Sequence, residues 1–332
     1  MKILLVAINA KYIHSNLAIY SLKAYAKAQN IELAEYTINQ QKDDILADIY
    51  KKRPDVLCFS CYIWNLDYIE ELVRDIGKLK ADLPIWLGGP EVSYDAKSVL
   101  ARLPQMRGIL KGEGEQTFAR LCEAYEDLES VRGITYRGPS GEIVDNPWRE
   151  PLDLDDIPFV YGEVNRDSER EDYAGWSMFD NRIVYYETSR GCPFSCSYCL
   201  SSVEKRLKFR SIPLVERELQ FFLDRRAPQV KFVDRTFNCN HEHAMAIWTY
   251  IAEHDNGVTN FHFEVAADLL NEEEISLIER MRPGLIQLEI GVQSTNPVTL
   301  QEIRRTMDFC RVRENVARLK KAGNVHQHLD LI

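Results

Sequence analysis

The stretch Thr188-Ser-Arg-Gly-Cys192-Pro-Phe-Ser-Cys196-Ser-Tyr-Cys199-Leu is the most informative part of this 332-residue sequence. It holds three of the chain's eight cysteines, in the spacing C-x3-C-x2-C, directly after an apolar segment at 183–187 that reads as a strand. Thiolates are the usual protein ligands of iron–sulfur clusters. Three of them on one loop can bind three irons of a [4Fe–4S] cube and leave the fourth iron open. An open coordination position distinguishes a catalytic metal centre from a closed structural one.

Other metal sites fit these cysteines less well. A structural zinc site would need Cys239 or His241 as a fourth ligand, and neither belongs to a second C-x2-C pair. A ferredoxin run would need a fourth cysteine in its own pattern, and none follows. The sequence therefore predicts an open cluster bound by Cys192, Cys196 and Cys199.

The remaining cysteines do not predict a second cluster. Cys58 and Cys61 form a C-x2-C, but Cys58 falls inside a predicted strand, where cysteine is commonly buried. Cys122 falls on a predicted helix and does not extend this pair.

Strands and helices alternate on both sides of the cysteines. The first part of the chain predicts strands at 2–8, 32–38, 55–61, 84–87 and 108–111, with helices at 15–29, 43–51, 66–80, 94–102 and 115–128. This order favours a doubly wound, mostly parallel, Rossmann-like sheet of five strands. Segments 131–136 and 142–146 predict a hairpin. Ligands of such sheets bind beyond the carboxyl ends of the strands.

The second part of the chain predicts an α/β barrel. Strands are expected at 183–187, 230–233, 260–265, 285–290 and 326–331, and helices at 213–225, 241–254, 271–280, 297–307 and 310–321. These are five repeats of barrel character. The proline-containing and acidic segment 147–180 lacks a sustained period and is too long for an ordinary loop. The predicted domains are therefore 1–146 and 181–332, joined by a linker at 147–180.

Composition restricts the possible partners. The chain has 51 Asp and Glu against 41 Lys and Arg, a net charge of −10. This balance disfavours a broad nucleic-acid surface, and the basic run 205–210 is expected to be a solvated face. No apolar run approaches the roughly 20 residues of a membrane helix, and no export signal is recognisable. The sequence predicts a cytoplasmic protein without a membrane partner.

The segment from Gly191 to Cys199 resembles the signature of radical S-adenosylmethionine (radical SAM) enzymes, C-x3-C-x-aromatic-C, with Tyr198 as the aromatic residue. The resemblance implies that the fourth iron binds the amino and carboxylate groups of SAM. One electron, from a donor such as flavodoxin or ferredoxin, would then cleave SAM to methionine and a 5′-deoxyadenosyl radical. It also implies a partial barrel of six strands. Since five are counted here, we expect 326–331 to be an edge strand and the chain to be a truncated form that holds SAM more weakly.

The same resemblance places SAM contacts at the ends of successive strands. Asp234, in a segment that departs from the family's usual Gly-Gly-Glu, is the expected partner of the SAM amino group. The further candidates are Glu264 for the ribose or ammonium, Gln293 and Ser294 for the ribose or carboxylate, and Arg304 or Arg305 for the carboxylate. A guanidinium suits the last role because it binds carboxylates bidentately.

A doubly wound domain before such a core resembles the cobalamin-binding domain of the B12-dependent radical SAM family. Loops at 9–16, 59–65, 86–91 and 111–115 carry the resemblance, and small residues there let a cofactor approach the backbone. The candidate contacts are Asn9, His14, Ser60, Gly88, Gly89 and Gly112. The lower-ligand motif Asp-x-His-x-x-Gly is incomplete, because Tyr12 and Leu17 stand in place of its Asp and Gly. His14 is therefore not expected to bind cobalt.

Together these resemblances imply a cobalamin-dependent radical SAM methyltransferase that acts on an unactivated carbon. Two alternatives remain open. The first is a cobalamin radical SAM enzyme that performs a cyclisation or rearrangement without methyl transfer. The second is a binding protein that retains the cofactor domains without turnover. The sequence indicates a small molecule or a peptide as substrate and assigns no catalytic residue.

Overall fold

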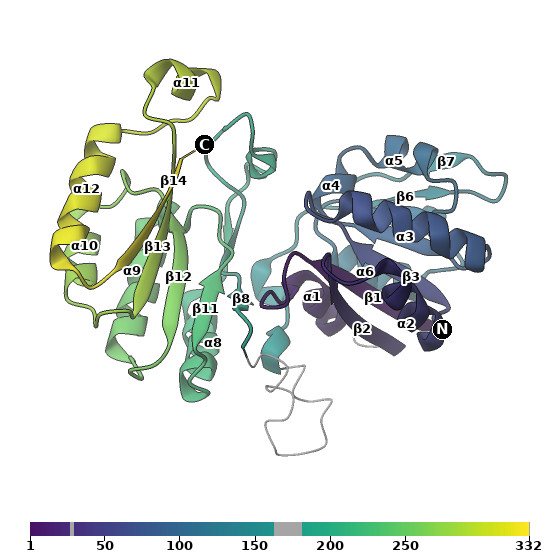
Figure 1. The fold of residues 1–332 in the computed structure, drawn as a ribbon, viewed down its shortest axis with the longest axis horizontal. Helices are drawn as coiled ribbons and strands as arrows, with labels where there is room; N and C mark the ends of the chain where they lie inside the picture. The colour runs from purple at the N-terminus through teal and green to yellow at the C-terminus, as the bar shows by residue number, and fades with distance from the viewer. Residues whose placement is uncertain (27–29, 163–180, 332) are drawn as a thin grey trace. The chain divides into compact units, whose positions relative to one another are not determined.

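The computed structural model of this protein describes residues 1–26, 30–162 and 181–331. The chain divides into two compact units, the first formed by residues 1–152 and 156–182 and the second by 153–155 and 183–332 (Figure 1). Most of the predicted linker, 163–180, and the end of the predicted helix at 15–29 lie outside the described residues. Within the described ranges, no helix combines the length and apolarity needed to cross a membrane.

The first unit is a seven-stranded sheet of order β2-β1-β3-β4-β5-β6-β7, with β1 to β5 parallel and the last two strands antiparallel. The five-strand expectation was too small because the predicted hairpin, β6 and β7, pairs with the edge of β5 and extends the sheet. The strands are β1 (Lys2–Asn9), β2 (Asn30–Thr37), β3 (Val56–Ser60), β4 (Ile85–Gly88), β5 (Gly108–Leu110), β6 (Ile134–Arg137) and β7 (Ile143–Asp145).

Helices cover both faces of this sheet, and this explains the continuous apolar run of β1, whose residues from Ile3 to Ile8 are buried. On α3, Ile69, Leu72, Val73 and Ile76 follow helical spacing and pack into one core. The helices are α1 (Leu17–Tyr25), α2 (Lys42–Lys52), α3 (Leu66–Leu79), α4 (Pro90–Ser93), α5 (Ala96–Arg102) and α6 (Glu115–Glu123). The predicted helix at 94–102 is thus shorter than expected and follows a separate turn of helix, α4.

Strand order fixes where a ligand can bind in this unit. β1 lies between β2 and β3, so the connections that leave β1 and β3 run in opposite directions across the sheet. In open α/β sheets, ligands bind at such a switch point, beyond the carboxyl ends of the strands. The loops at this place are 10–16, after β1, and 61–65, after β3.

The second unit holds a five-stranded parallel sheet of order β14-β13-β12-β11-β8. The strands are β8 (Val184–Tyr186), β11 (Gln229–Phe232), β12 (Asn260–Val265), β13 (Ile286–Gln293) and β14 (His326–Leu331), and two short strands, β9 (Ser189–Arg190) and β10 (Lys208–Phe209), form a separate pair. Among the described residues β14 pairs with β13 alone, so it is an edge strand, as expected.

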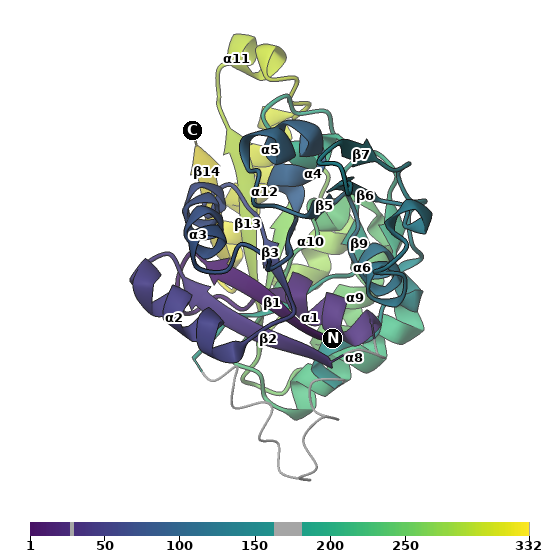
Figure 2. The ribbon, with the colours of Figure 1, turned by 90° about the vertical axis from the view of Figure 1, so that its right-hand side faces the viewer.

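Helices cover one face of this second sheet (Figure 1). They are α8 (Ile212–Asp224), α9 (His241–Glu253), α10 (Glu272–Glu279) and α12 (Phe309–Ala322), and a further short helix, α11 (Pro297–Glu302), follows β13. The predicted helix at 297–307 ends earlier, at Glu302, and Arg304 beyond it has a left-handed backbone with φ of 54°. Short α11 projects beyond the ends of the strands in both views (Figures 1 and 2).

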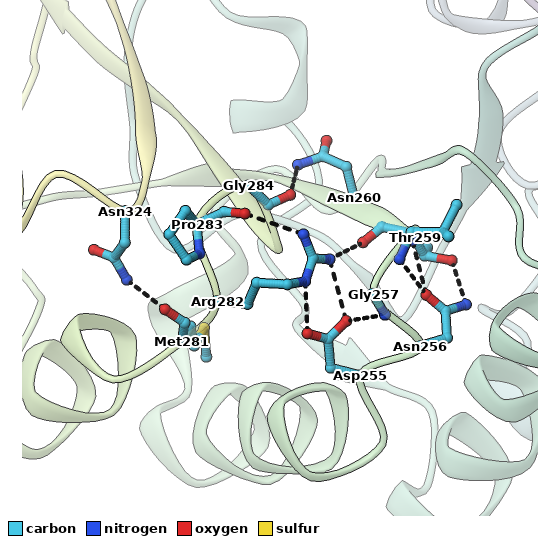
Figure 3. Close-up of polar contacts among 11 residues, drawn as sticks. Asp255, Asn256, Gly257, Thr259, Asn260, Met281, Arg282, Pro283, Gly284 and Asn324 are labelled. Carbon is cyan, nitrogen blue, oxygen red and sulfur yellow. Dashed lines mark hydrogen bonds and ion pairs between the residues drawn. The ribbon is translucent and has the colours of Figure 1, made fainter.

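Polar side chains bind together the loops that precede β12, β13 and β14 (Figure 3). Arg282 donates to both carboxylate oxygens of Asp255, at 2.7 and 3.1 Å, and to the Thr259 carbonyl at 3.2 Å. The buried Asn324 amide donates to the carbonyls of Ile278 and Met281. These contacts lie at the amino ends of the strands, the end that serves stability in barrels of this kind.

Replacing Arg282 by alanine should lower the free energy of unfolding of this unit by about 1–3 kcal/mol, since Asp255 loses a bidentate partner and a loop carbonyl loses its donor. Urea unfolding measures the effect. The matched control is Arg318→Ala, which removes a bidentate arginine whose partners Glu272 and Glu279 lie at the surface; we expect it to cost less than about 1 kcal/mol. Equal losses in the two variants would contradict the assignment.

Candidate functional site

The three cysteines lie on the segment 191–207, called the cysteine loop below, which connects β9 to β10. Those two strands pair antiparallel at its base, with Ser189 opposite Phe209 and Arg190 opposite Lys208. The loop follows β8 at the carboxyl edge of the sheet, as predicted from the sequence. The short β9–β10 pair was not predicted, because two-residue strands leave no periodic signal.

The end of the basic run 205–210 is not the solvated face that the sequence suggested. Arg210 is buried and forms an ion pair of 2.8 Å with the buried Glu218 of α8. Lys205 donates to the Ser195 hydroxyl at 2.9 Å and also to the Phe194 carbonyl. Arg210 therefore holds the base of the cysteine loop from the interior, while Lys205 contacts the loop from an exposed position.

Gly191 allows the cysteine loop to close tightly on itself. Its φ is 91°, and a Cβ at this position would lie 2.5 Å from the Arg206 carbonyl oxygen. The next amide, of Cys192, donates to the Glu204 carbonyl at 3.2 Å. The two ends of the loop thus meet backbone to backbone, directly before the first cysteine.

Polar groups from two other strand ends approach the cysteine sulfurs. The Thr236 hydroxyl, after β11, lies 3.7 Å from Cys192 Sγ. An Arg305 Nη1–H, after β13, donates to Cys196 Sγ at 3.7 Å. Cys192 and Cys196 are buried and Cys199 is half-buried, and all three are free thiols.

Residues 1–26, 30–162 and 181–331 hold no group of three His, Cys, Asp or Glu side chains that could bind a metal ion together. The three sulfurs therefore do not converge on one point. A [4Fe–4S] cube does not require this, because each thiolate binds a different iron. The donor set fits such a cube: three thiols on one loop, with a cationic N–H directed at one sulfur.

The end of β13 is irregular where sequence reasoning placed Gln293 and Ser294. The pairing with β14 shifts register between Gly291 and Gln293, and Gln293 has a left-handed φ of 67°. A Cβ on Gly291 would lie 2.7 Å from Gln293 Nε2 and 3.5 Å from Arg305 Nη2. Strained backbone and strand bulges are typical of sites that re-aim a side chain for function.

Two atoms at this corner have no hydrogen-bond partner although they are buried, namely Gln293 Oε1 and Arg305 Nε. Arg305 also donates to the Gly291 carbonyl, so the guanidinium lies between the strand end and Cys196. Ser294 is half-buried, and its hydroxyl accepts from the Asn296 amide at 3.2 Å. Arg304 is exposed. Sequence reasoning brought Gln293, Ser294 and Arg305 together but did not find the contact between Arg305 and Cys196.

Asp234, after β11, lies in the interior and has no exposed surface. Its Oδ1 accepts from the amides of Thr188 and Ser189 at 2.8 and 3.0 Å, and its Oδ2 accepts from the Thr188 hydroxyl. Burial raises the pKa of this carboxyl to about 7, although those hydrogen bonds favour the charged form. In the structure, Asp234 therefore contacts the segment that leads to the cysteine loop.

Charged residues occupy the sheet face opposite the helices. Lys231 Nζ lies 2.7 Å from Glu289 Oε2 and 3.8 Å from Glu264 Oε1, and His262 Nε2 lies 3.0 Å from Glu289 Oε2. The neighbouring His262, reinforced by Lys231, holds the pKa of Glu289 at about 2. Burial raises the pKa of Glu264 from its ordinary value. Glu264 thus belongs to a row of charged residues that runs across β11, β12 and β13.

In the first unit, the predicted contacts Asn9 and Ser60 are buried at the ends of β1 and β3. Asn9 Nδ2 donates to the His14 carbonyl and to Glu35 Oε1, both at 3.0 Å. Asn65 joins the two strand ends, since its Nδ2 donates to the carbonyls of Ile8 and Ser60. These polar side chains therefore shape the loops at the switch point.

Gly89 and Gly112 have backbone that disfavours any side chain. Gly89 has φ of 113°, and its Cβ would lie 2.3 Å from the Cys61 carbonyl oxygen. Gly112 has φ of 68°, and its Cβ would lie 3.2 Å from the Trp148 ring. Gly88, the last residue of β4, accepts from the Cys61 amide at 2.7 Å. The β3 and β4 ends are thus in close backbone contact.

Large apolar side chains are exposed on the loops at these strand ends. Tyr62 and Trp64 stack at 4.5 Å, and Tyr94 stacks on Trp148 at 5.6 Å. The exposed members are Tyr12, Ile13, Ile63, Trp64, Tyr94 and Trp148. Exposed apolar groups gathered at a ligand-binding edge are typical of a site for a large, partly apolar ligand, and they fit a corrin ring. His14 is half-buried in the first of these loops, where its amide donates to the Lys11 carbonyl.

Two family models match the chain, one for each unit. Residues 3–122 match the B12 binding domain, and residues 186–332 match the radical SAM superfamily. The matches therefore include the strands β1 to β5, the cysteine loop, and the second sheet from the last residue of β8 onward.

Individual relatives carry the same two parts. An uncharacterised methyltransferase, PH0819, of Pyrococcus horikoshii is 25% identical over 84% of this chain and 60% of its own length. An anaerobic magnesium-protoporphyrin IX monomethyl ester cyclase of Rubrivivax gelatinosus is 24% identical over 92% of this chain and 55% of its own length. This chain therefore spans little more than half of either relative.

A solved structure of the cobalamin-dependent SAM radical enzyme OxsB, with aqua-cobalamin and SAM bound, has the same fold. The TM-score is 0.78 at 19% identity, over 100% of this chain and 49% of OxsB. The predicted fold class, a doubly wound sheet followed by a partial barrel, is confirmed.

Proposed function

We propose that this chain, which belongs to the radical SAM proteins with a B12-binding domain, reductively cleaves SAM and transfers a methyl group to an unactivated carbon. The observation that carries the proposal is the cysteine loop at the carboxyl edge of a parallel sheet, with Arg305 directed at the sulfur of Cys196. When bound, a [4Fe–4S] cluster supplies the electron for SAM cleavage, and cobalamin supplies methyl transfer. The protein binds, orients and shields these groups.

Cys192, Cys196 and Cys199 hold three irons in this proposal, and the polar corner at the end of β13 holds SAM beside the open fourth iron. Gln293 Oε1 and Arg305 Nε are suited to this role because both atoms are buried without a partner. A buried polar atom that lacks a partner costs free energy, and a bound polar ligand recovers it. Arg305 suits the SAM carboxylate, and Gln293 with Ser294 suits the ribose.

The charged face of the second sheet suits the polar parts of SAM and of the substrate. Glu264 is 32% exposed and lies beyond hydrogen-bond distance of Lys231, so it retains acceptor capacity for a ribose hydroxyl or an ammonium. Lys231 and Glu289 form an ion pair in which each neutralises the charge of the other. In this proposal the substrate is a small molecule or a peptide, and the electron donor is a flavodoxin or a ferredoxin.

Cobalamin is assigned to the loops at the carboxyl ends of β1, β3 and β4 and to the segment around Gly112. Gly88, Gly89 and Gly112 keep the backbone accessible, and the exposed aromatic residues supply apolar contact. Asn9 and Ser60 act beneath the surface, where Asn9 braces the loop that carries His14.

Anaerobic reconstitution of the full chain with iron and sulfide, followed by cobalamin and SAM, tests the proposal. We expect bound iron, bound cobalamin, reductant-dependent 5′-deoxyadenosine, and transfer of label from methyl-deuterated SAM to a small molecule or peptide of the cell extract. Cleavage without label transfer would favour cyclisation or rearrangement, the reaction class of the Rubrivivax relative. Bound cofactors without SAM cleavage would indicate a binding protein.

Replacing His14 by alanine should leave cobalamin bound, with little change in the cobalt absorption spectrum. The reason is that the ligand motif is incomplete, with Tyr12 and Leu17 in place of its acidic and glycine residues. Equilibrium dialysis and visible spectroscopy measure the two effects. A spectral shift that indicates loss of an imidazole ligand would contradict this expectation.

A further inference from the structure

Asp234 connects two strand ends beneath the cysteine loop. Its carboxylate is wholly buried and accepts three hydrogen bonds, from the amides of Thr188 and Ser189 and from the Thr188 hydroxyl. Thr188 and Ser189 form the passage from β8 to β9, and the loop begins two residues later, at Gly191. The carboxylate therefore fixes the backbone from which the cysteine loop starts.

His243 and Phe209 also contact these residues. His243 Nε2 of α9 lies 3.2 Å from the Thr188 hydroxyl, and burial lowers the pKa of this histidine to about 4. The neutral ring also packs on Phe209, with centroids 5.0 Å apart, and Phe209 pairs with Ser189. The connection from β8 to β9 is thus held by the Asp234 carboxylate, by the His243 imidazole and by the pairing of β9 with β10.

The segment of Asp234 also reaches the first cysteine. Thr236 follows two residues later, and its hydroxyl lies 3.7 Å from Cys192 Sγ. One short segment after β11 therefore contacts both the start of the cysteine loop and a cysteine sulfur. Movement of Asp234 would displace both at once.

Direct contact with SAM is a poorer description of Asp234. Its Oδ1 already accepts hydrogen bonds from two backbone amides, and its Oδ2 accepts one from a hydroxyl. The residue also exposes no surface to a ligand. An ammonium could reach the carboxylate only by displacing Thr188 or Ser189. Their amides would then be buried without an acceptor, which costs about 1–3 kcal/mol each.

We infer that Asp234 is a positioning residue that holds the cysteine loop in the geometry required for cluster binding, through Thr188 and Ser189. This inference rests on the proposed function, since it assumes that the cysteines bind a cluster. It separates the loop-positioning role from SAM recognition, which falls to the corner formed by Gln293 and Arg305. Mutation of residues that support metal ligands from outside the first coordination shell typically lowers metal affinity by roughly 10–100-fold.

Two substitutions distinguish the roles. Asp234→Ala removes every acceptor, so we expect iron retention after anaerobic reconstitution and desalting to fall by about tenfold or more. Asp234→Asn keeps one oxygen for the two amides, and its NH2 can donate to the Thr188 hydroxyl, which in turn can donate to His243. The asparagine variant should therefore retain iron, the electron paramagnetic resonance spectrum of the reduced cluster, and the spectral change on addition of SAM.

A readout on the chain without its cluster keeps the inference independent of turnover. Alkylation of Cys192 and Cys196, followed by peptide mass spectrometry, should be faster in Asp234→Ala than in the parent chain, with the buried Cys58 as internal standard. The matched control is Asp255→Ala, a carboxylate at the opposite end of the sheet. It should lower stability without changing cysteine alkylation or iron retention.

Specific outcomes would overturn the inference. Full iron retention in Asp234→Ala would overturn the positioning role. Full iron with loss of the SAM-induced spectral change in Asp234→Asn would instead make Asp234 a SAM contact. If Asp234→Ala does not fold, Thr188→Val decides, because it removes one donor without changing the shape; faster alkylation of Cys192 supports the inference, and an unchanged rate overturns it. A parent chain that binds no iron would reject the proposed function, and this inference with it.

Discussion

Replacement of Cys192, Cys196 or Cys199 by alanine should abolish cluster absorbance and SAM cleavage together. Each cysteine is the sole protein ligand of its iron in the proposed site, so two thiolates would remain for a cube that needs at least three from this loop. We expect bound iron to fall by about tenfold or more in each variant. Iron analysis and visible absorbance after anaerobic reconstitution measure the first effect, and 5′-deoxyadenosine formation measures the second.

The other cysteines supply matched controls. A cysteine binds metal as the thiolate, and burial raises the pKa of Cys58 and, to about 12, that of Cys122. Alanine at either position should leave iron and SAM cleavage unchanged. Loss of the cluster in Cys58→Ala would contradict the ligand assignment.

Cys239 offers the sharper test, because it was the possible fourth ligand of a closed site. Burial raises the pKa of its thiol to about 11, which disfavours the thiolate. Cys239→Ala should retain the cluster and its response to SAM. A chain that loses its metal in this variant would have four cysteine ligands, and the open iron that SAM requires would be absent.

The cysteine site could be predicted from the sequence because ligand spacing within one loop is a local property. Cys192, Cys196 and Cys199 need no knowledge of the sheet to be recognised as a group. The alternation of strands and helices is local as well, and it predicted both parallel sheets. Strand pairing is not local, so the hairpin of β6 and β7 was predicted but its place at the edge of β5 was not.

The partners of Asp234 and Arg305 could not be predicted for the same reason. Asp234 meets Thr188 across 46 positions of sequence, and only because β11 pairs with β8. Arg305 meets Cys196 across 109 positions, beyond the end of β13. In both cases the sequence associated the residue with the end of a strand, while its contact depends on which strand ends become neighbours.

Gly89→Ala should be the most destabilising single substitution in the loops of the first unit. Gly89 has φ of 113° and ψ of 173°, a region that is essentially restricted to glycine and costs other residues about 1–3 kcal/mol. The added Cβ would also lie 2.3 Å from the Cys61 carbonyl oxygen and 3.0 Å from its amide nitrogen. Backbone cannot rotate away as a side chain can, so β3 and β4 must separate at their carboxyl ends. We expect a loss of about 3–5 kcal/mol in the free energy of unfolding.

Gly141→Ala is the matched control for this prediction. It too has a positive φ, 87°, but a Cβ there meets nothing within 4 Å, so only the backbone cost of about 1–2 kcal/mol applies. Hydrogen exchange followed by mass spectrometry on the full chain should show faster exchange in peptides of β3 and β4 in Gly89→Ala, with peptides of β11 to β13 unchanged. Cobalamin affinity should fall in the same variant and persist in Gly141→Ala, because the loops after β3 and β4 carry the proposed apolar contacts. Equal exchange in the two variants would show that the close approach of Gly89 to Cys61 does not hold these strand ends together.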